Sequence, residues 1–462
     1  MAKTLYKYDG EVNKVTWFVT WNYSLRNVYT NDVNYVPDPV SGNSYNTYVE
    51  FRSYEPGMVN IDWGDGNKEQ VAMTYIPSSN FYVVMFRSLN IEYRKNPDSS
   101  VWWYKKSDGS QYIPVPPHHY EDDSTTIQRA ISLDFTCPVS KAYFRTCHFT
   151  EFPILDLPDL DTLSIYDSKG INSIPYDRLA RATKLTQIDF YELGSVKMDV
   201  LPESITSKAS INTLNIGSCF DFSDIEASGL RRIGNITGLV GLNVRNNSLK
   251  KYIKEFNDLP NLLSLGMEYG GKAISDEEFA DFPDMSEVDR INPSIRSLSL
   301  YKAWYNGAGV GRRTRIPEAL NGMGVENLTS IDLSYNRNID YSLPFPDWIY
   351  EARSASSFDA KCCFVTVEDA DRFVSGIYNA TTNWEQSTMS QMAKDGKRNQ
   401  WYGLSVSIYD LVYHPTFKRP SGVEQAPEGF VKGQSNGNPL TGMEMVYVLK
   451  NNYAQRWSVP PE

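Results

Sequence analysis

Histidine and cysteine are scarce in this chain. Its 462 residues include 4 histidines and 5 cysteines, against 31 tyrosines and 10 tryptophans. Few groups therefore titrate near neutral pH, and the aromatic excess favours β-rich recognition surfaces over acid–base chemistry. The cysteines are odd in number and scattered, which is a poor pattern for a disulfide framework. We expect reduced, buried thiols at Cys137, Cys147, Cys219, Cys362 and Cys363.

Long apolar runs and a basic stripe are also missing. No window reaches the roughly 18 consecutive apolar residues of a membrane span, and the N-terminal residues lack the apolar core of a secretory signal. We therefore expect no membrane insertion and no export by an ordinary signal, and the Met-Ala-Lys start is typical of a full-length chain. The net charge of -11 disfavours binding to nucleic acid, since only Arg312, Arg313 and Arg315 form a short basic cluster.

The N-terminal part has the alternation of β-strands. Val15 and Trp17 face one side of a predicted strand, and Thr16 and Phe18 face the other. Further on, Val59, Ile61 and Trp63 alternate into the turn Gly64-Asp65-Gly66-Asn67, and the chain returns from Lys68 to Ile76 as in a β-hairpin. This Trp-Gly-Asp-Gly hairpin resembles the signature of the PKD domain family. The resemblance implies an all-β, immunoglobulin-like sandwich in residues 1–125, which end in a proline-rich linker.

One pattern, L-x-x-L-x-L-x-x-N/C-x-L, recurs at roughly 20–35-residue intervals in residues 126–365. Two copies are nearly complete: Leu239, Leu242, Val244, Asn247 and Leu249 form one, and Leu328, Ile331, Leu333, Asn336 and Ile339 form the other. Looser copies are centred on Leu163, Ile188, Leu214, Leu265 and Leu298, and degenerate copies on Ala142 and Phe358. Over about half of its length, the chain therefore resembles the leucine-rich-repeat family.

This resemblance implies an irregular solenoid with short parallel strands on its concave face. The leucines of each strand point into the solenoid, and the Asn or Cys turns the chain and bonds to the backbone of the neighbouring coil. Cys147, Cys219 and Cys363 fall at that turning position. Irregular repeat lengths predict loops and short helices, rather than uniform long helices, on the convex side.

Residues 366–462 are predicted to form a C-terminal α+β cap or docking segment. Thr366 is placed to cap a helix whose apolar residues recur at helical spacing, namely Val367, Ala370, Val374 and Ile377. Two strands are predicted beyond this helix, from Leu404 to Ile408 and from Met443 to Leu449, separated by a loop rich in glycine, proline and asparagine.

The residues between the buried leucines should project in register from the concave face. One column holds Ser164, Asp189, Asn215, Asn243, Gly266, Ser299, Asp332 and Asp359, and the next holds Tyr166, Tyr191, Gly217, Arg245, Glu268, Tyr301, Ser334 and Lys361. Tyrosines among small polar residues suit a sugar or a protein partner. The candidate binding residues on this face are Tyr166, Tyr191, Arg245 and Tyr301. The alternative is a solvated face whose polar residues serve solubility alone.

Residues 301–315 are predicted to form a contact loop. The intervals from Leu265 to Leu298 and from Leu298 to Ile331 exceed the usual repeat length, so extra chain must bulge from the solenoid. The second bulge contains residue types that are enriched in binding hot spots, namely Trp304, Tyr305, Arg312 and Arg313. The alternative is a surface loop whose tryptophan packs back onto the solenoid.

Three groups of residues have both a chemical and a structural interpretation. The run from His118 to Asp123 offers metal ligands but falls in the presumed linker. Asp62, Asp65 and Asn67 offer oxygens to calcium, yet a tight turn explains them. The glycines at 307, 309 and 311 suit a dinucleotide fingerprint, but Arg312 replaces its final glycine. We prefer the structural interpretation of each. Because catalytic motifs are also missing, we predict no enzyme activity, no catalytic residues, no metal and no cofactor.

The combination of PKD-like and leucine-rich-repeat segments with a Tyr/Asn-rich tail is similar to structural proteins of crAss-like phages and their relatives that infect Bacteroidales. This resemblance implies a virion component, tail- or capsid-associated, that is assembled in the host cytoplasm. Its partners would be other virion proteins and a host-surface glycan or protein. The alternative is a bacterial surface or secreted leucine-rich-repeat adhesin. A glycan-processing enzyme that uses the aspartate column as acid and base is the weakest interpretation.

Overall fold

The computed structural model divides into two compact units. The N-terminal unit comprises Met1–Phe220 with Ala227–Ile236, and the C-terminal unit comprises Asp221–Glu226 with Thr237–Glu462. The structure describes residues 13–19, 26–27, 48–87 without 65 and 67, 94–95, 102–105, 112–115, 129–267 without 146, 148, 169 and 195, 282–300, 316–336, 339, 345–352, 354–382, 401, 403–409 and 417–460.

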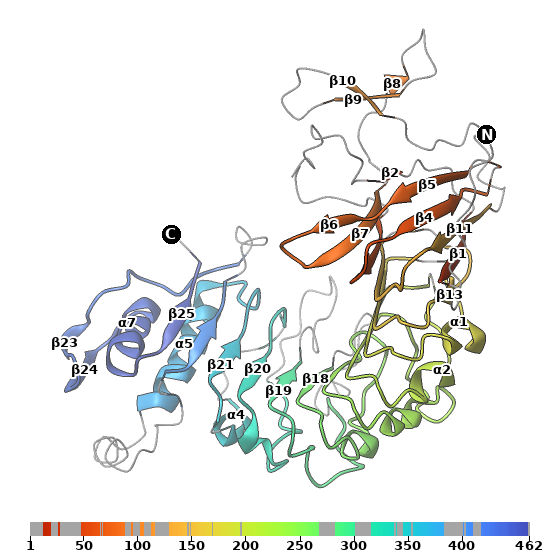
Figure 1. Cartoon of the computed structure of the whole chain (residues 1–462). Coiled ribbons are helices and arrows are strands. Elements are labelled where there is room, and N and C mark those ends of the chain that lie inside the picture. Colours follow the sequence, from red (N-terminus) through yellow and green to blue (C-terminus); the bar gives the residue numbers. More distant parts are fainter. Residues whose placement is uncertain are drawn as a thin grey trace. The chain divides into compact units, whose positions relative to one another are not determined.

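A five-stranded antiparallel sheet opens the N-terminal unit (Figure 1). Its strands, in spatial order, are β13 (Ile154–Asp156), β1 (Lys14–Val19), β11 (Arg129–Phe135), β4 (Met58–Asp62) and β5 (Lys68–Ala72). β4 and β5 form the predicted hairpin, with Gly64 and Gly66 at positive φ in its turn. β11 and β13 come after residue 125, so this sheet continues past the position where the sequence predicts a boundary.

A second sheet of the N-terminal unit begins antiparallel and becomes parallel. Its order is β2 (Arg26–Asn27), β7 (Phe81–Arg87), β3 (Tyr48–Ser53), β12 (Lys141–Arg145), β14 (Thr162–Tyr166), β15 (Gln187–Tyr191) and β16 (Thr213–Gly217), with β6 (Thr74–Ile76) beside β7. The pairs from β12 to β16 are parallel. A small antiparallel sheet contains β8 (Arg94–Lys95), β9 (Trp102–Lys105) and β10 (Tyr112–Val115).

Aromatic side chains join the first two sheets. The ring of Trp17 lies 6.0 Å from that of Phe144, and Phe51 lies 5.0 Å from Phe135, measured between ring centroids. All four side chains are buried, and such edge-on or tilted pairs add to the free energy gained by burial. The assignment of this part to a PKD-like module stays a prediction.

The parallel ladder of repeat strands is confirmed in both units. In the N-terminal unit, Leu163, Ile188 and Leu214 pair one after another, and each is fully buried. The C-terminal unit continues the pattern through β17 (Gly241–Asn243), β18 (Ser264–Gly266), β19 (Ser297–Ser299), β20 (Ser330–Asp332) and β21 (Ser357–Asp359). β22 (Ser405–Ser407) and β25 (Arg456–Ser458) extend the ladder beyond residue 365, where the sequence places its end.

The turning position follows the expected chemistry in two successive coils. The buried Asn336 amide donates to the carbonyl of Leu333 in its own coil at 2.7 Å and to that of Leu300 in the preceding coil at 2.9 Å. The Cys363 thiol likewise donates to the Leu333 carbonyl of the preceding coil at 3.2 Å. All five cysteines are free and buried, and the predicted burial is confirmed. Cysteine thus replaces asparagine as the donor that joins successive coils.

A left-handed residue precedes the turning position in several coils. The non-glycine residues with positive φ include Asp167, Glu192, Ser218, Asn246, Tyr335 and Cys362. Each directly follows one member of the tyrosine-containing column, so the chain leaves these strands through the same kind of turn. This conformation crowds a Cβ against the backbone and costs roughly 1–2 kcal/mol per residue.

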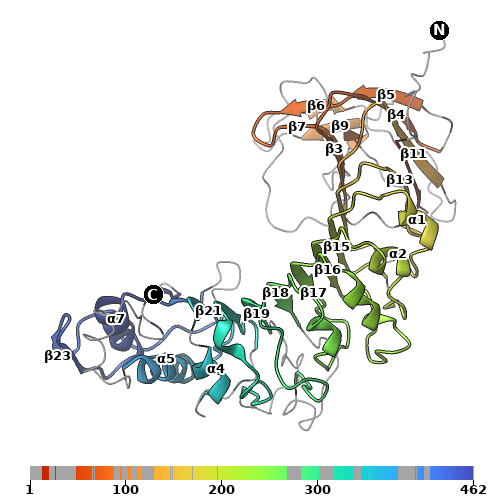
Figure 2. The same ribbon diagram turned by 60° about the horizontal axis from the view of Figure 1, so that its bottom comes forward.

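The coils are connected by short helices and loops, which confirms that prediction for the described residues (Figure 2). Between β12 and β21, the connecting helices are α1 (Tyr176–Ala180), α2 (Glu203–Thr206), η1 (Leu230–Asn235), η2 (Lys254–Phe256), η3 (Val325–Asn327) and α4 (Asp347–Glu351). None exceeds two turns, so burial of their apolar residues, rather than helix propensity, stabilises them.

The predicted strand from Met443 to Leu449 is wrong. These residues lie in α7 (Gly442–Asn452), because the Thr441 side chain accepts from the Glu444 backbone and the Glu444 carboxylate accepts from the Thr441 backbone, which forms a capping box. Alternating apolar residues obscured the helix in the sequence, since Met443, Val446 and Leu449 also share one buried helical face.

Helix α5 (Val367–Thr382) begins where the sequence predicts. The Thr366 hydroxyl accepts from the Asp369 backbone at 3.1 Å. Ala370, Val374 and Ile377 are buried as expected, whereas Val367 is exposed. α5 packs on α7 through Val374, and β23 (Glu428–Val431) forms a hairpin with β24 (Ser435–Asn438). The role of this part as a cap stays a prediction.

Candidate functional site

Polar side chains of the N-terminal unit lie in register on the sheet face opposite the buried leucines. Tyr143, Ser164, Asp189 and Asn215 pair along one column, as Arg145, Tyr166, Tyr191 and Gly217 do along the next. β3 adds Glu50 opposite Tyr143 and Arg52 opposite Lys141. We call this surface the N-terminal polar face: Glu50, Arg52, Lys141, Tyr143, Arg145, Thr162, Ser164, Tyr166, Gln187, Asp189, Tyr191, Thr213, Asn215 and Gly217.

Tyr166 and Tyr191 form an exposed aromatic pair on this face. Their ring centroids lie 6.1 Å apart, with an angle of 34° between the ring planes. The two side chains remain 38% and 42% exposed, so a partner can reach both rings. Partial burial, and then the charge of Asp189, raise the pKa of the Tyr166 phenol, which stays protonated at neutral pH.

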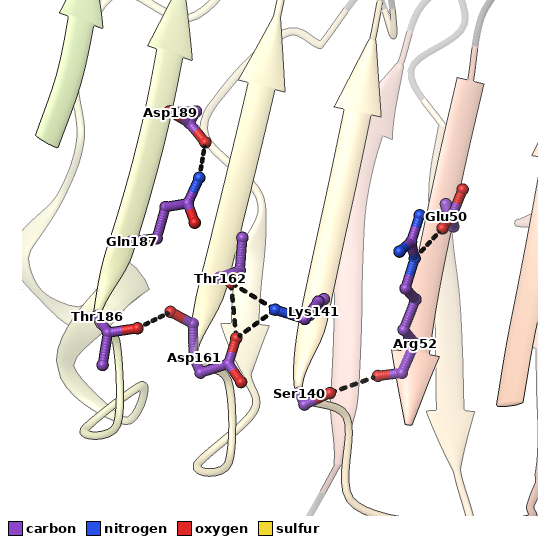
Figure 3. A network of polar contacts seen from close by, with 9 residues as sticks. All are labelled: Glu50, Arg52, Ser140, Lys141, Asp161, Thr162, Thr186, Gln187 and Asp189. Atoms are coloured by element: carbon purple, nitrogen blue, oxygen red, sulfur yellow. Dashed lines mark hydrogen bonds and ion pairs between the residues drawn. The ribbon is translucent and has the colours of Figure 1, made fainter. Parts of the chain in front are cut away.

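Asp189 lies beside the two tyrosines and is only 7% exposed. The side-chain amide of Gln187 donates to its Oδ2 atom at 2.6 Å (Figure 3), and the Asn215 amide donates to its Oδ1 atom. Two neutral donors therefore fix the carboxylate in place, one from its own strand and one from the next strand. This arrangement satisfies part of its hydrogen-bonding capacity without cancelling its charge.

Two ion pairs hold the neighbouring part of the face. Arg52 binds the buried carboxylate of Glu50, and its guanidinium lies 5.0 Å from the centre of the Tyr143 ring. Lys141 contacts Asp161 at 3.3 Å and donates to the Thr162 hydroxyl at 3.2 Å (Figure 3). Because Arg52 contacts Tyr143 and Lys141 contacts Thr162 across adjacent strands, the face is organised before any partner arrives.

The C-terminal unit carries a corresponding polar face with a different network. Arg245 donates to the hydroxyl of Ser299 at 2.6 Å, and that hydroxyl donates to Asp332 at 2.8 Å. Lys361 lies 3.7 Å from Asp359. Each of these carboxylates therefore has a basic side chain in its network. Burial, and then the charge of Asp332, raise the pKa of Asp359 above its usual value despite Lys361.

The structure brings together only some of the predicted binding residues. Tyr166 and Tyr191 are neighbours in the N-terminal unit, whereas Arg245 belongs to the C-terminal unit. The predicted loop residues all lie outside the described residues, namely Tyr301, Trp304, Tyr305, Arg312 and Arg313. The same holds for Glu268, Asp65 and Asn67, for the run from His118 to Asp123 and for the glycines at 307, 309 and 311.

Sequence reasoning missed several residues of the N-terminal polar face. Glu50 and Arg52 reach it because β3 pairs with β12, which lies far along the chain, and no local pattern signals that pairing. Gln187 had a signal, since it stands two positions before Asp189 and must share its face in a strand.

Other features of the described residues are not part of this face. A cavity of about 520 Å³ in the C-terminal unit is lined by Asp289, Arg290, Gly322, Gly324, Glu326 and Glu351. No group of three or more His, Cys, Asp or Glu side chains within the described ranges is placed to hold a metal ion. In the same ranges, the helices are all too short or too polar to span a membrane.

Comparison with known proteins identifies distant structural neighbours only. No protein-family model matches this chain, and no curated protein matches it. A leucine-rich-repeat protein of Leptospira interrogans has 14% identity and a TM-score of 0.30, and the match covers 48% of each chain. An internalin of Listeria monocytogenes has 14% identity and a TM-score of 0.25, with 52% of this chain and 79% of that chain covered.

The chain spans about half the length of the Leptospira protein. The parallel ladder fits a leucine-rich-repeat solenoid. This assignment rests on the register of the strands and the buried turning residues, which the structure itself provides.

Proposed function

We propose that this chain is a non-enzymatic recognition protein whose N-terminal polar face binds a partner. The observation that supports this proposal is the exposed pair of Tyr166 and Tyr191 beside polar side chains that the protein itself holds in place. Tyrosine offers a large contact area at low entropic cost, and groups fixed before binding lose little freedom on binding. Both properties favour recognition.

The proposal extends to a biological setting. The resemblance of the sequence to structural proteins of Bacteroidales phages supports a virion component, tail- or capsid-associated, that serves attachment or decoration. Its partners would be other virion proteins and a glycan or protein on the host surface. The second candidate is a bacterial surface or secreted adhesin. The exposed tyrosines also favour this candidate, because they can bind a ligand without the protein being part of a virion.

Blocking the face tests the proposal. Thr213 is half-buried and pairs with Gln187 at the start of β16, so a Thr213→Cys variant carrying a maleimide-linked polyethylene glycol should cover the face. The same label on Ser173→Cys, an exposed position before α1, is the matched control. Incorporation into particles from an infected Bacteroidales culture and binding to intact Bacteroidales cells would be measured.

The two candidates predict different results with these proteins. A virion component enters particles with the Ser173 label and is excluded with the Thr213 label. An adhesin binds cells with the Ser173 label and fails to bind them with the Thr213 label, and it enters no particle with either label. If both labelled proteins enter particles and bind cells equally well, the N-terminal polar face is not the binding surface.

A further inference from the structure

The carboxylate of Asp189 differs from the nearby acidic groups of Glu50 and Asp161. Glu50 is bonded to Arg52, and Asp161 is bonded to Lys141. Asp189 is only 7% exposed. Within the described residues, its carboxylate bonds only to the neutral amides of Gln187 and Asn215. A negative charge this shielded from water is stabilised most by a positive charge that approaches it directly.

The groups around Asp189 are also rich in acceptors. Each amide donates to the carboxylate, and neither amide oxygen receives a hydrogen bond from a described residue. Arg145 precedes Tyr166 in the adjacent column, and its charge partly offsets the rise in the pKa of the Tyr166 phenol. In the described part of the chain, Arg145 forms no ion pair with Asp189. Among the residues that the structure describes, Asp189 therefore has no positively charged hydrogen-bond partner, and a partner protein can supply one.

The two tyrosine rings suit a cation as well. Tyr166 and Tyr191 lie in register on adjacent strands, with Asp189 in the neighbouring column of the same sheet face. The faces of aromatic rings attract cations within about 6 Å of the ring centroid. A cationic group at this place can therefore contact a ring while it donates to the carboxylate.

We propose that Asp189, Tyr166 and Tyr191 bind the ammonium or guanidinium group of a lysine or arginine side chain on a protein partner. The inference rests on the proposed function, because it names the chemistry that the N-terminal polar face recognises. An ammonium group brings three donors and a positive charge, which complements an acceptor-rich site with one uncompensated carboxylate. A neutral sugar brings donors but no charge, so charge complementarity favours the cation.

A short peptide tests this chemistry on the full-length protein. The probe is an end-blocked peptide with three lysines separated by glycines, and its control is the same peptide with all lysines acetylated. Binding would be measured by isothermal titration calorimetry. Because the net charge of -11 attracts any cationic peptide, Asp189→Asn is compared with Asp177→Asn, which changes the net charge equally at an exposed position on α1.

The expected result is binding of the lysine peptide that Asp189→Asn weakens by roughly tenfold or more, while Asp177→Asn matches the wild type. Tyr191→Leu should weaken binding and Tyr191→Phe should preserve it, since the ring face is retained. Unchanged thermal unfolding of the variants shows that they fold. Equal binding by the two asparagine variants, or equal binding of the acetylated peptide, overturns the proposal.

Failure of this inference is distinguishable from failure of the proposed function. If the Thr213 label blocks particle or cell binding but Asp189→Asn binds the lysine peptide like the wild type, the face binds by other chemistry. Binding of neutral oligosaccharides that Tyr191→Leu abolishes and Asp189→Asn spares would assign the face to glycans instead. If the Thr213 label blocks nothing, the proposed function fails, whatever the peptide result.

Discussion

The guanidinium of Arg245, which follows β17, reaches the hydroxyl of Ser299 on β19 although β18 lies between these two strands. The contact passes over Gly266. A Cβ atom at that position would lie 3.3 Å from Nε of Arg245 and 3.1 Å from the side-chain oxygen of Asn243. Glycine therefore leaves room here for the close approach of neighbouring side chains, and its role is not to form a turn.

Adding a side chain at Gly266 should uncouple this pair. In the wild type, Ser299→Ala removes a hydrogen bond to a charged group and should lower the free energy of unfolding by about 1–2 kcal/mol. In a Gly266→Val background, where Arg245 is displaced, the same change should have little effect. Urea unfolding of the four proteins measures the coupling. An equal cost of Ser299→Ala in both backgrounds would contradict the role of Gly266.

Truncation of a ladder leucine should destabilise the C-terminal unit strongly. Leu242 and Leu333 are at most 2% exposed, so Leu242→Ala or Leu333→Ala should lower the free energy of unfolding by about 2–5 kcal/mol. Leu263 is 45% exposed beside the same ladder, and Leu263→Ala should change it by less than about 0.5 kcal/mol. Chemical denaturation measures all three. Similar effects at Leu242 and Leu263 would mean that the register is misassigned.

Alkaline pH should destabilise the N-terminal unit through its buried thiols. Burial raises the pKa of Cys219 from 9.0 to about 12 and raises that of Cys147 as well. The neutral Cys219 thiol thus contributes stability that is fully present below pH 9 and is lost as pH rises from about 9 towards 12. The loss should approach about 1.4 kcal/mol per pH unit for each thiol.

A serine at the turning position separates this effect from general alkaline unfolding. Cys219→Ser keeps a donor for the Gly217 carbonyl, which the thiol contacts at 3.1 Å, and does not titrate in this range. The variant should show a shallower decline of unfolding free energy between pH 9 and 11. The same slope as in the wild type would show that the Cys219 thiol does not control it.

A glycine in a left-handed position should stabilise the fold. Glu192 has a φ of 52° in the turn after β15 and is only half-buried. Glu192→Gly relieves the crowding of its Cβ and should raise the free energy of unfolding by up to about 1 kcal/mol. Arg372→Gly, in the exposed face of α5, should lower it by about 1 kcal/mol. Calorimetric melting of both variants checks the contrast in sign.

The sequence predicted the parts of the fold that local patterns encode. The spacing of Leu163, Ile188 and Leu214 predicted three neighbouring strands, and it also placed Tyr166 beside Tyr191. Both follow from side-chain alternation within one strand and repetition between coils. The predicted turning role of Cys363 followed from the same repetition.

Pairings between distant segments could not be predicted in this way. β11 completes a sheet with β1 across more than a hundred residues, and β3 places Glu50 and Arg52 on the polar face, although neither strand carries a signal for its partner. The helix at Met443 was missed for another reason. Its apolar residues satisfy both helical and strand periodicity, and the Thr441 capping box decides between the two.

Leu265, Leu298 and Ile331 pair consecutively in the ladder and are separated by equal lengths of chain. A gene segment that encodes one such coil can therefore be duplicated or lost without turning any other side chain to the wrong face. An insertion or deletion of another length within a strand can turn the following side chains to the wrong face. Evolution can thus lengthen or shorten this protein by whole coils, and each step adds or removes one row of surface side chains while the interior pattern stays the same.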